Sequence, residues 1–415
     1  MQPLPTRDEA LDLDRQDPLA NKRAEFLLDE DVIYLCGNSL GPMPKSLIPR
    51  MDRTLTHDWA KGLIGSQNSA GWFLMPITLG DRMAPILGAG EGEVVVCDST
   101  GLNIYKALHA AISMQPGRNT IVSEAQSFPT DLYMIEGVTS LLPQMQVKLE
   151  GRDGDRVEEL IHDDTAVVLI NHADYRSGAL RDVKAITSRA HSAGALVVVD
   201  LCHSTGVMPI NLHDDNVDFA VGCTYKYLNA GPGSPAYIYV ANRHHGKFSQ
   251  PLTGWHGHAE PFKFEQEYRP AAGAAAMLTG TQPTLSMIGV AAGLDVLEGV
   301  DAIQLRAKAA SLSSIFIRQL EPWCEGHGIG FYSAKNMDAR NGQVALTHEN
   351  GYPIMQALIA RGVIGDFRQP NILRFGFSPL FLTHANAFDA AMHLREVMET
   401  GEWKDSRFQK SNLVT

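Results

Sequence analysis

The chain has 415 residues, of which 44% are hydrophobic and 20% charged, the composition of a globular protein large enough for two domains. Its 35 Lys and Arg residues against 47 Asp and Glu residues give a net charge of -12, which argues against nucleic acid or an anionic membrane as a partner. No signal peptide or bilayer-spanning stretch is evident, and the five scattered cysteines lack a C-x-x-C pair. We therefore expect a cytoplasmic protein with reduced thiols.

The first 90 residues mix helical patterning with turns. Helices are predicted over residues 8–30 and 45–61, a strand over 32–35 and a turn-rich segment over 37–42. A polar loop is predicted over residues 65–72. Its glycines, amides and tryptophan are typical of loops that carry function, although exposed turns have a similar composition.

From residue 93 onward, apolar strands alternate with helical segments. Strands are predicted over residues 94–97, 120–124, 165–170, 195–200 and 219–222, with helices opening at 98–103 and 127–131. This alternation predicts an α/β fold with a mostly parallel sheet covered on both sides. The helix start at Asp98-Ser99-Thr100-Gly101 can cradle a phosphate with backbone N–H groups, but it is also an ordinary capping sequence.

Beyond residue 240 the pattern changes. An aromatic loop over residues 254–258 precedes a long helical region over 284–297, strands near 343–347 and 371–377, and terminal helices. We expect a large domain over residues 51–290 and a smaller α+β domain over 291–415. An N-terminal segment, residues 1–50, is expected to join the smaller domain.

Two of the predicted strands lead to side chains that could take part in catalysis. Lys226 follows the apolar run 219–222. If the side chain is buried, the pKa of its amine is lowered, and the neutral amine is a nucleophile that forms an imine with a carbonyl compound. Alternatively, the side chain extends to water and stays charged. Asp200 ends an apolar run at the sheet edge where ligands bind, or it caps a helix. Together they suit pyridoxal phosphate. The lysine carries the aldehyde as a Schiff base, and the carboxylate keeps the pyridinium nitrogen protonated.

Five segments, which match in order from about residue 30 to 380, resemble the kynureninase family. They are Gly37-Asn38-Ser39-Leu40-Gly41, Ser127-Phe128-Pro129-Thr130-Asp131-Leu132-Tyr133, Asp200-Leu201-Cys202-His203, Thr224-Tyr225-Lys226-Tyr227-Leu228-Asn229 with Gly231-Pro232-Gly233-Ser234, and Gly254-Trp255-His256-Gly257-His258. The resemblance implies the aspartate-aminotransferase fold, which is fold type I of the pyridoxal phosphate enzymes. It implies hydrolytic Cβ–Cγ cleavage of L-kynurenine or 3-hydroxykynurenine to anthranilate or 3-hydroxyanthranilate and L-alanine. This reaction belongs to tryptophan catabolism and NAD biosynthesis.

The resemblance also implies roles for individual residues. Lys226, Tyr225 and Asp200 would be catalytic, and Arg374 would clamp the substrate carboxylate, with Asn38, Ser39 and Gln67 near the substrate. Trp255 and Thr281 would reach the cofactor phosphate from the partner subunit, which implies a homodimer with shared active sites. The residues implied to bind the cofactor are Thr100, Gly101, Phe128, Asp131, Asp200, His203, Tyr225, Lys226, Trp255 and Thr281.

Three positions depart from the family pattern. Gly101 stands where the family usually has Ser or Thr, which removes one phosphate hydroxyl but keeps the backbone N–H. Cys36 replaces an Asp that is common before Gly37, and Gln67 stands where bacterial relatives often carry an aromatic residue. The last departure leaves the preference for ring substituents open.

Several of these residues also have structural interpretations. His203 and Phe128 could be core residues and Tyr225 could serve packing, whereas His256 and His258 lack the clustered partners of a metal site. Two rival functions are also compatible with these residues. One is another enzyme of the same fold, a cysteine desulfurase or an aminotransferase. The other is a non-catalytic pyridoxal phosphate protein, which usually carries a DNA-binding module that neither terminus offers.

Overall fold

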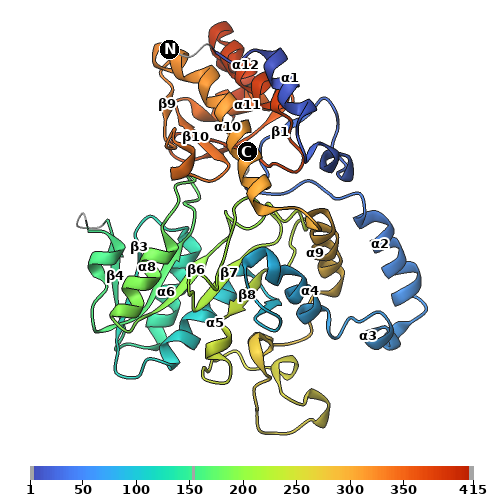
Figure 1. The fold of residues 1–415 in the computed structure, drawn as a ribbon, viewed down its shortest axis with the longest axis vertical. Helices are drawn as coiled ribbons and strands as arrows, with labels where there is room; N and C mark the ends of the chain where they lie inside the picture. The colour runs from blue at the N-terminus through green and yellow to red at the C-terminus, as the bar shows by residue number, and fades with distance from the viewer. Residues whose placement is uncertain (1–3, 152–154, 411–415) are drawn as a thin grey trace.

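The computed structural model describes residues 4–151 and 155–410. Its largest sheet has seven strands, and Figure 1 shows this sheet packed among helices. The strands of this sheet are β2 (Val94–Val96), β3 (Thr120–Glu124), β4 (Gln146–Glu150), β5 (Thr165–Asn171), β6 (Leu196–Asp200), β7 (Phe219–Gly222) and β8 (Tyr237–Val240). Their order across the sheet is β2-β8-β7-β6-β5-β3-β4. The pairings are parallel except for the two that β8 makes with β2 and β7. The sheet is therefore mostly parallel, as predicted.

Both faces of this sheet are covered, which explains why its strands are continuous apolar runs. In β6, Val197 and Val199 join one hydrophobic cluster, whereas Val198 joins the cluster on the opposite face. The covering helices and their neighbours are α4 (Met75–Met83), α5 (Thr100–Ser113), α6 (Pro129–Leu141), α7 (Val157–Leu160), α8 (Val183–Ser192) and α9 (Thr284–Leu297). Helix α5 contacts β5 to β8, and α8 contacts β6.

A second, smaller layer of structure lies at the other end of the molecule (Figure 1). Its four-stranded sheet has the order β12-β13-β10-β9, and every pairing in it is antiparallel. These strands are β9 (Gly330–Phe331), β10 (Gln343–Thr347), β12 (Asp366–Arg368) and β13 (Ile372–Gly376). Helices α1 (Arg7–Arg15), α10 (Ala302–Cys324), α11 (Gly351–Ala360) and α12 (His384–Thr400) surround it.

The N-terminal segment links the two layers. Strand β1 (Ile33–Tyr34) pairs in parallel with β11 (Val363–Ile364), and the turn after it reaches the loop that carries Lys226. Gly41 donates its N–H to the Tyr225 carbonyl at 2.7 Å, and a Cβ at Gly41 would lie 2.4 Å from the Lys226 carbonyl oxygen. Only glycine allows this approach.

The structure corrects several of the predicted elements. The strands predicted over residues 120–124, 219–222 and 343–347 have those bounds, but β4 and β8 were not predicted. The helix predicted over residues 8–30 ends at Arg15, and a separate 3-10 helix follows at Ala20–Glu25. The helix predicted over 45–61 divides into α2 (Leu47–Arg53) and a π-helical segment, Thr54–Trp59, and the predicted loop 65–72 contains the short helix α3 (Ser66–Ser69).

Among the described residues, no helix is both long enough and apolar enough to span a membrane.

Candidate active site

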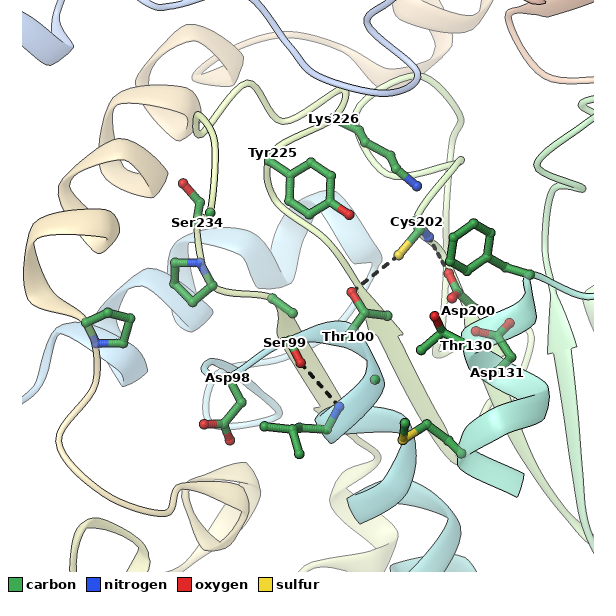
Figure 2. Close-up of a pocket in the computed structure, with 18 of the residues that line it drawn as sticks. Asp98, Ser99, Thr100, Thr130, Asp131, Asp200, Cys202, Tyr225, Lys226 and Ser234 are labelled. Atoms are coloured by element: carbon green, nitrogen blue, oxygen red, sulfur yellow. Dashed lines mark hydrogen bonds between the residues drawn. The ribbon is translucent and has the colours of Figure 1, made fainter. Parts of the chain in front are cut away.

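A cavity of about 770 Å³ lies at the carboxyl edge of the large sheet (Figure 2). Strands β6 and β7 are parallel neighbours with Asp200 opposite Val221, so the residues that follow both strands emerge on the same side. Asp200 and Lys226 therefore both line this cavity. Asp200 and Lys226, which the sequence suggested share a site, are brought to one cavity by the register of β6 with β7.

Lys226 contacts a buried histidine. Its Nζ lies 2.9 Å from Nε2 of His203 and 5.9 Å from the centre of the Tyr225 ring. Burial, followed by the charge of Lys226, lowers the pKa of His203 well below its ordinary value. Nε2 of a neutral imidazole can accept a hydrogen bond from the lysine Nζ, so His203 can hold the lysine in position.

Asp200 is 5% exposed and forms part of the cavity lining. Among the described residues its carboxylate accepts one hydrogen bond, from the backbone N–H of Cys202 at 2.6 Å. Burial raises the pKa of Asp200 well above its ordinary value. A buried carboxylate without an ion-pair partner has the environment that a cationic ring nitrogen would complete.

A second buried carboxylate stands beside it. Oδ2 of Asp131 accepts hydrogen bonds from Ser127 Oγ at 2.7 Å and from Asn171 Nδ2 at 2.9 Å. Burial, with the charge of Asp200 as the next cause, raises the pKa of Asp131 to about 7. Sequence analysis did not find Asn171, which ends strand β5 directly beside Asp200. The sequence feature that could have indicated Asn171 is its position at the end of a buried apolar strand.

The start of helix α5 forms another wall of the cavity (Figure 2). Ser99 caps the helix by accepting a hydrogen bond from Leu102 N, and Thr100 Oγ1 lies 3.6 Å from Cys202 Sγ. A Cβ at Gly101 would lie 3.1 Å from the Thr130 methyl group, so glycine keeps this wall open. Backbone N–H groups at such a helix start attract an anion.

Arg374, which the resemblance implies to bind the substrate carboxylate, lies in a cluster of polar residues outside the cavity lining. Arg374 is 2% exposed; its Nε donates to Asp366 Oδ1 at 2.6 Å, and its Nη2 donates to Ser39 Oγ at 2.9 Å. Its Nη2 also contacts Asp366 Oδ2, and its Nη1 donates to the Tyr175 carbonyl. Asp366 was not predicted from the sequence, because its place opposite Arg374 depends on the register of β12 with β13.

Not every predicted site residue lines the cavity. Thr100, Gly101, Phe128, Asp131, Asp200, His203, Tyr225, Lys226 and Thr281 do. The described residues that line it do not include Asn38, Ser39, Gln67, Trp255 or Arg374. Gln67 lies in α3, and Asn38 is buried with its Nδ2 2.7 Å from Gln343 Oε1.

Comparison with known proteins gives the family. The chain is 44% identical to a kynureninase of Burkholderia pseudomallei (strain 1106a) over 415 residues, which cover 99% of this chain and 100% of the relative. The chain belongs to the kynureninase family. A kynureninase of Pseudomonas fluorescens is 42% identical with the same coverage, and the sequence profile of the kynureninase C-terminal domain matches residues 305–394. As a family member, the chain is a hydrolase that uses pyridoxal phosphate.

Solved structures with the same fold are more distant. An apo cysteine desulfurase from Thermococcus onnurineus NA1 has a TM-score of 0.75 at 19% identity and covers 92% of this chain and 98% of its own. A C-DES variant with glycine covalently linked to its PLP cofactor has a TM-score of 0.77 at 14% identity, with coverage of 90% and 98%. At these identities the likeness shows fold type I alone. The full-length kynureninase matches therefore favour the kynureninase function over the rival desulfurase.

The geometry of the cavity fits pyridoxal phosphate. Asp200 offers a buried anionic partner for the ring nitrogen, and Lys226 offers the amine for the aldehyde. The start of α5 offers N–H groups for the phosphate. Phe128 is 43% exposed although it lines the cavity, which leaves its ring face available for stacking.

Proposed function

We propose that this chain hydrolyses the Cβ–Cγ bond of L-kynurenine or 3-hydroxykynurenine and releases L-alanine with anthranilate or 3-hydroxyanthranilate. The observation that carries the proposal is the convergence of Lys226 and Asp200 on one cavity in a chain of the kynureninase family. Bound pyridoxal phosphate supplies an electron sink for the electron pair left at Cα of the substrate. The chain's own residues hold that group and move the protons.

Cofactor binding would involve the walls of the cavity. We assign the ring nitrogen to Asp200, the ring face to Phe128 and the phosphate to Thr100, Gly101 and Tyr225. Asp131 and His203 would contact the polar edge of the ring. The raised pKa of Asp200 supports this assignment, because a carboxylate disfavoured by burial gains most from a cationic partner.

We assign proton transfer to two groups. Lys226 Nζ would take the α-proton of the substrate, and its contact with His203 Nε2 at 2.9 Å supports a fixed position for the amine. Burial raises the pKa of Tyr225, so its hydroxyl stays protonated at neutral pH and can donate a proton. Tyr225 points into the cavity (Figure 2), where it would serve the hydration of the γ-carbonyl and the cleavage that follows.

The substrate carboxylate would bind Arg374, with Asn38, Ser39 and Gln67 at the substrate. A planar guanidinium binds carboxylate through two parallel hydrogen bonds. In the described structure the Arg374 guanidinium is paired with the Asp366 carboxylate. We propose that the substrate carboxylate displaces part of this ion pair when it binds. Arg368, whose Nη2 lies 3.2 Å from Asp366 Oδ2, is available to hold Asp366 afterwards.

We also propose a homodimer in which Trp255 and Thr281 reach the cofactor phosphate of the partner subunit. In its own chain, Thr281 lines the cavity and Trp255 lies outside the lining. Support comes from large apolar side chains exposed on the described surface, which a second copy could cover. They include Trp59, Ile64, Trp255, Phe262 and Phe264. We propose a cytoplasmic location, supported by the five free cysteines.

The proposal is tested by a substrate panel. The enzyme loaded with pyridoxal phosphate is incubated with L-kynurenine, 3-hydroxykynurenine and L-cysteine, and the products are separated by chromatography. We expect anthranilate or 3-hydroxyanthranilate with equimolar alanine, and no sulfide. Sulfide from cysteine, or a keto acid without alanine, would assign the chain to one of the rival functions.

A further inference from the structure

A buried glutamate outside the cofactor cavity is hydrogen-bonded to one of the residues that line it. Glu124 ends strand β3 and is 5% exposed. Its Oε2 accepts hydrogen bonds from the backbone N–H of Asn171 at 2.9 Å and from Asn171 Nδ2 at 3.4 Å. Asn171 lines the cofactor cavity, whereas Glu124 lines a second cavity of about 380 Å³. Glu124 therefore lies directly behind a residue of the cofactor cavity wall.

Strand register explains why Asn171 needs this partner. The last pairing of β3 with β5 joins Ser123 to Leu169, so β5 continues for two residues past the paired region and ends at Asn171. The Glu124 carboxylate takes the place of a strand carbonyl for the Asn171 N–H. A buried backbone N–H without such a partner is unfavourable. The carboxylate is therefore required where it lies.

An arginine holds the other oxygen of Glu124. Arg181 Nε lies 2.5 Å from Glu124 Oε1, and the same guanidinium donates to Glu150 Oε1 at 2.7 Å. Burial raises the pKa of Glu124 to about 7, and the charge of Arg181 opposes that rise. The ion pair therefore favours the ionised form of Glu124 and fixes the direction of its carboxylate.

Asn171 passes this restraint on to Asp131. Asn171 Nδ2 donates to Asp131 Oδ2 at 2.9 Å and to Ser127 Oγ at 2.6 Å, and Ser127 Oγ donates to the same Oδ2 at 2.7 Å. Oδ1 of Asp131 accepts no hydrogen bond from the described residues, and Asp131 lines the cofactor cavity (Figure 2). Rotation of the Asn171 amide would therefore change the position of this carboxylate.

We propose that Glu124 is a positioning residue for cofactor binding. With Arg181 it fixes the Asn171 amide, and the fixed amide orients the Asp131 carboxylate toward the polar edge of the cofactor. The inference rests on the role of Asp131 in the proposed function. Glu124 is not among the described residues that line the cofactor cavity, so we assign its effect to the contact with Asn171.

The test measures the dissociation constant of pyridoxal phosphate by equilibrium dialysis at about pH 8.5, where Glu124 and Asp131 are both mostly ionised. Glu124→Gln keeps the size of the side chain but removes its charge, and should raise the dissociation constant about tenfold. Glu150→Gln is the matched control, because Glu150 also pairs with Arg181 but forms no hydrogen bond with Asn171 in the described structure. It should lower the melting temperature as Glu124→Gln does and leave the dissociation constant within about twofold of wild type.

A double-mutant cycle separates positioning from a general loss of stability. In an Asn171→Ala background, Glu124→Gln should change the dissociation constant by less than about twofold, because the amide that transmits the effect is absent. The visible circular dichroism of the bound cofactor, which reports how its ring is held, should fall in Glu124→Gln and keep its wild-type value in Glu150→Gln. If Glu124→Gln does not fold, Arg181→Gln replaces it in the same cycle, with the same expected direction.

Two results would overturn the proposal. One is an unchanged dissociation constant in Glu124→Gln, or in Arg181→Gln where that variant replaces it. The other is a rise that persists in full in the Asn171→Ala background. Because the readout is cofactor binding, a failed product assay beside the expected binding results would refute the proposed reaction and leave this inference standing.

Discussion

Lys226 lies beside ionisable groups whose pKa values are shifted by burial. Its Nζ contacts a histidine that burial keeps neutral, and the raised pKa values of Asp200 and Asp131 arise from the same burial at the sheet edge. The sequence predicted Lys226 and Asp200 because Lys226 follows one continuous apolar strand and Asp200 ends another. It could not predict the contact between Lys226 and His203, which depends on where two loops meet.

Replacing Lys226 should remove covalent attachment of the cofactor. After borohydride reduction and digestion, the wild-type peptide that contains Lys226 should carry the mass of the reduced cofactor. Lys226→Ala should carry none, because Lys226 is the only lysine among the described residues that line the cavity. Lys106→Arg is the control, since Lys106 is buried but paired with Asp98 at 2.7 Å. Labelling of another lysine in Lys226→Ala would refute the assignment.

The raised pKa of Asp131 predicts a pH-dependent stability. Between about pH 4 and 7 the folded cofactor-free protein holds a proton that the unfolded chain has released, so stability falls as pH rises through this window. A rise of about three pKa units in Asp131 corresponds to at most about 4 kcal/mol in the free energy of unfolding.

Asp131→Asn should therefore flatten the decline in the melting temperature of the cofactor-free protein between pH 4 and 7. The exposed Asp163→Asn should follow wild type. A decline as steep in Asp131→Asn as in wild type would assign the effect to another group.

At the scale of elements, the hairpin of β12 and β13 organises the carboxylate clamp. Its register places Asp366 directly opposite Arg374, and Ser39 from the N-terminal turn contacts both. The sequence predicted a strand near residues 371–377 but not its partner β12, because a three-residue strand carries too little pattern. Strand β4 was missed for a related reason. As an edge strand it lacks the continuous apolar run of its neighbours.

Arg374→Lys should raise KM for kynurenine more than it lowers kcat. Lysine cannot form two parallel hydrogen bonds with a carboxylate, so about 2 kcal/mol, roughly 30-fold in kcat/KM, should be lost. Arg368→Lys, in the same hairpin but more exposed, should change KM much less. Steady-state kinetics on both variants decides this. An unchanged KM in Arg374→Lys would place the substrate carboxylate elsewhere.

At the scale of the molecule, the fold class was predictable but the order of the strands was not. Alternating apolar runs predict a parallel sheet, whereas the order β2-β8-β7-β6-β5-β3-β4 is set by packing between distant segments. The division into residues 1–50, 51–290 and 291–415 stays a prediction. It is consistent with the large sheet, whose strands lie within residues 94–240, and with the pairing of β1 with β11.

The proposed dimer predicts that activity requires association. Sedimentation should show a dimer, and Trp255→Ala should weaken cofactor retention because the phosphate would lose a contact from the partner subunit. Mixing Trp255→Ala with Lys226→Ala should restore one competent site in each mixed dimer, because one site then keeps both Lys226 and the partner's tryptophan. A fully active monomer, or mixtures without recovered activity, would contradict the shared site.

If the Cβ–Cγ bond is cleaved by hydrolysis with Lys226 as the base, oxygen from water must enter the product. The reaction of the loaded enzyme with L-kynurenine is run in ¹⁸O-enriched water, and both products are analysed by mass spectrometry. We predict anthranilate with solvent oxygen in its carboxylate, an equal amount of alanine, and neither product from Lys226→Ala. Anthranilate without solvent oxygen, or equal turnover by Lys226→Ala, would contradict it.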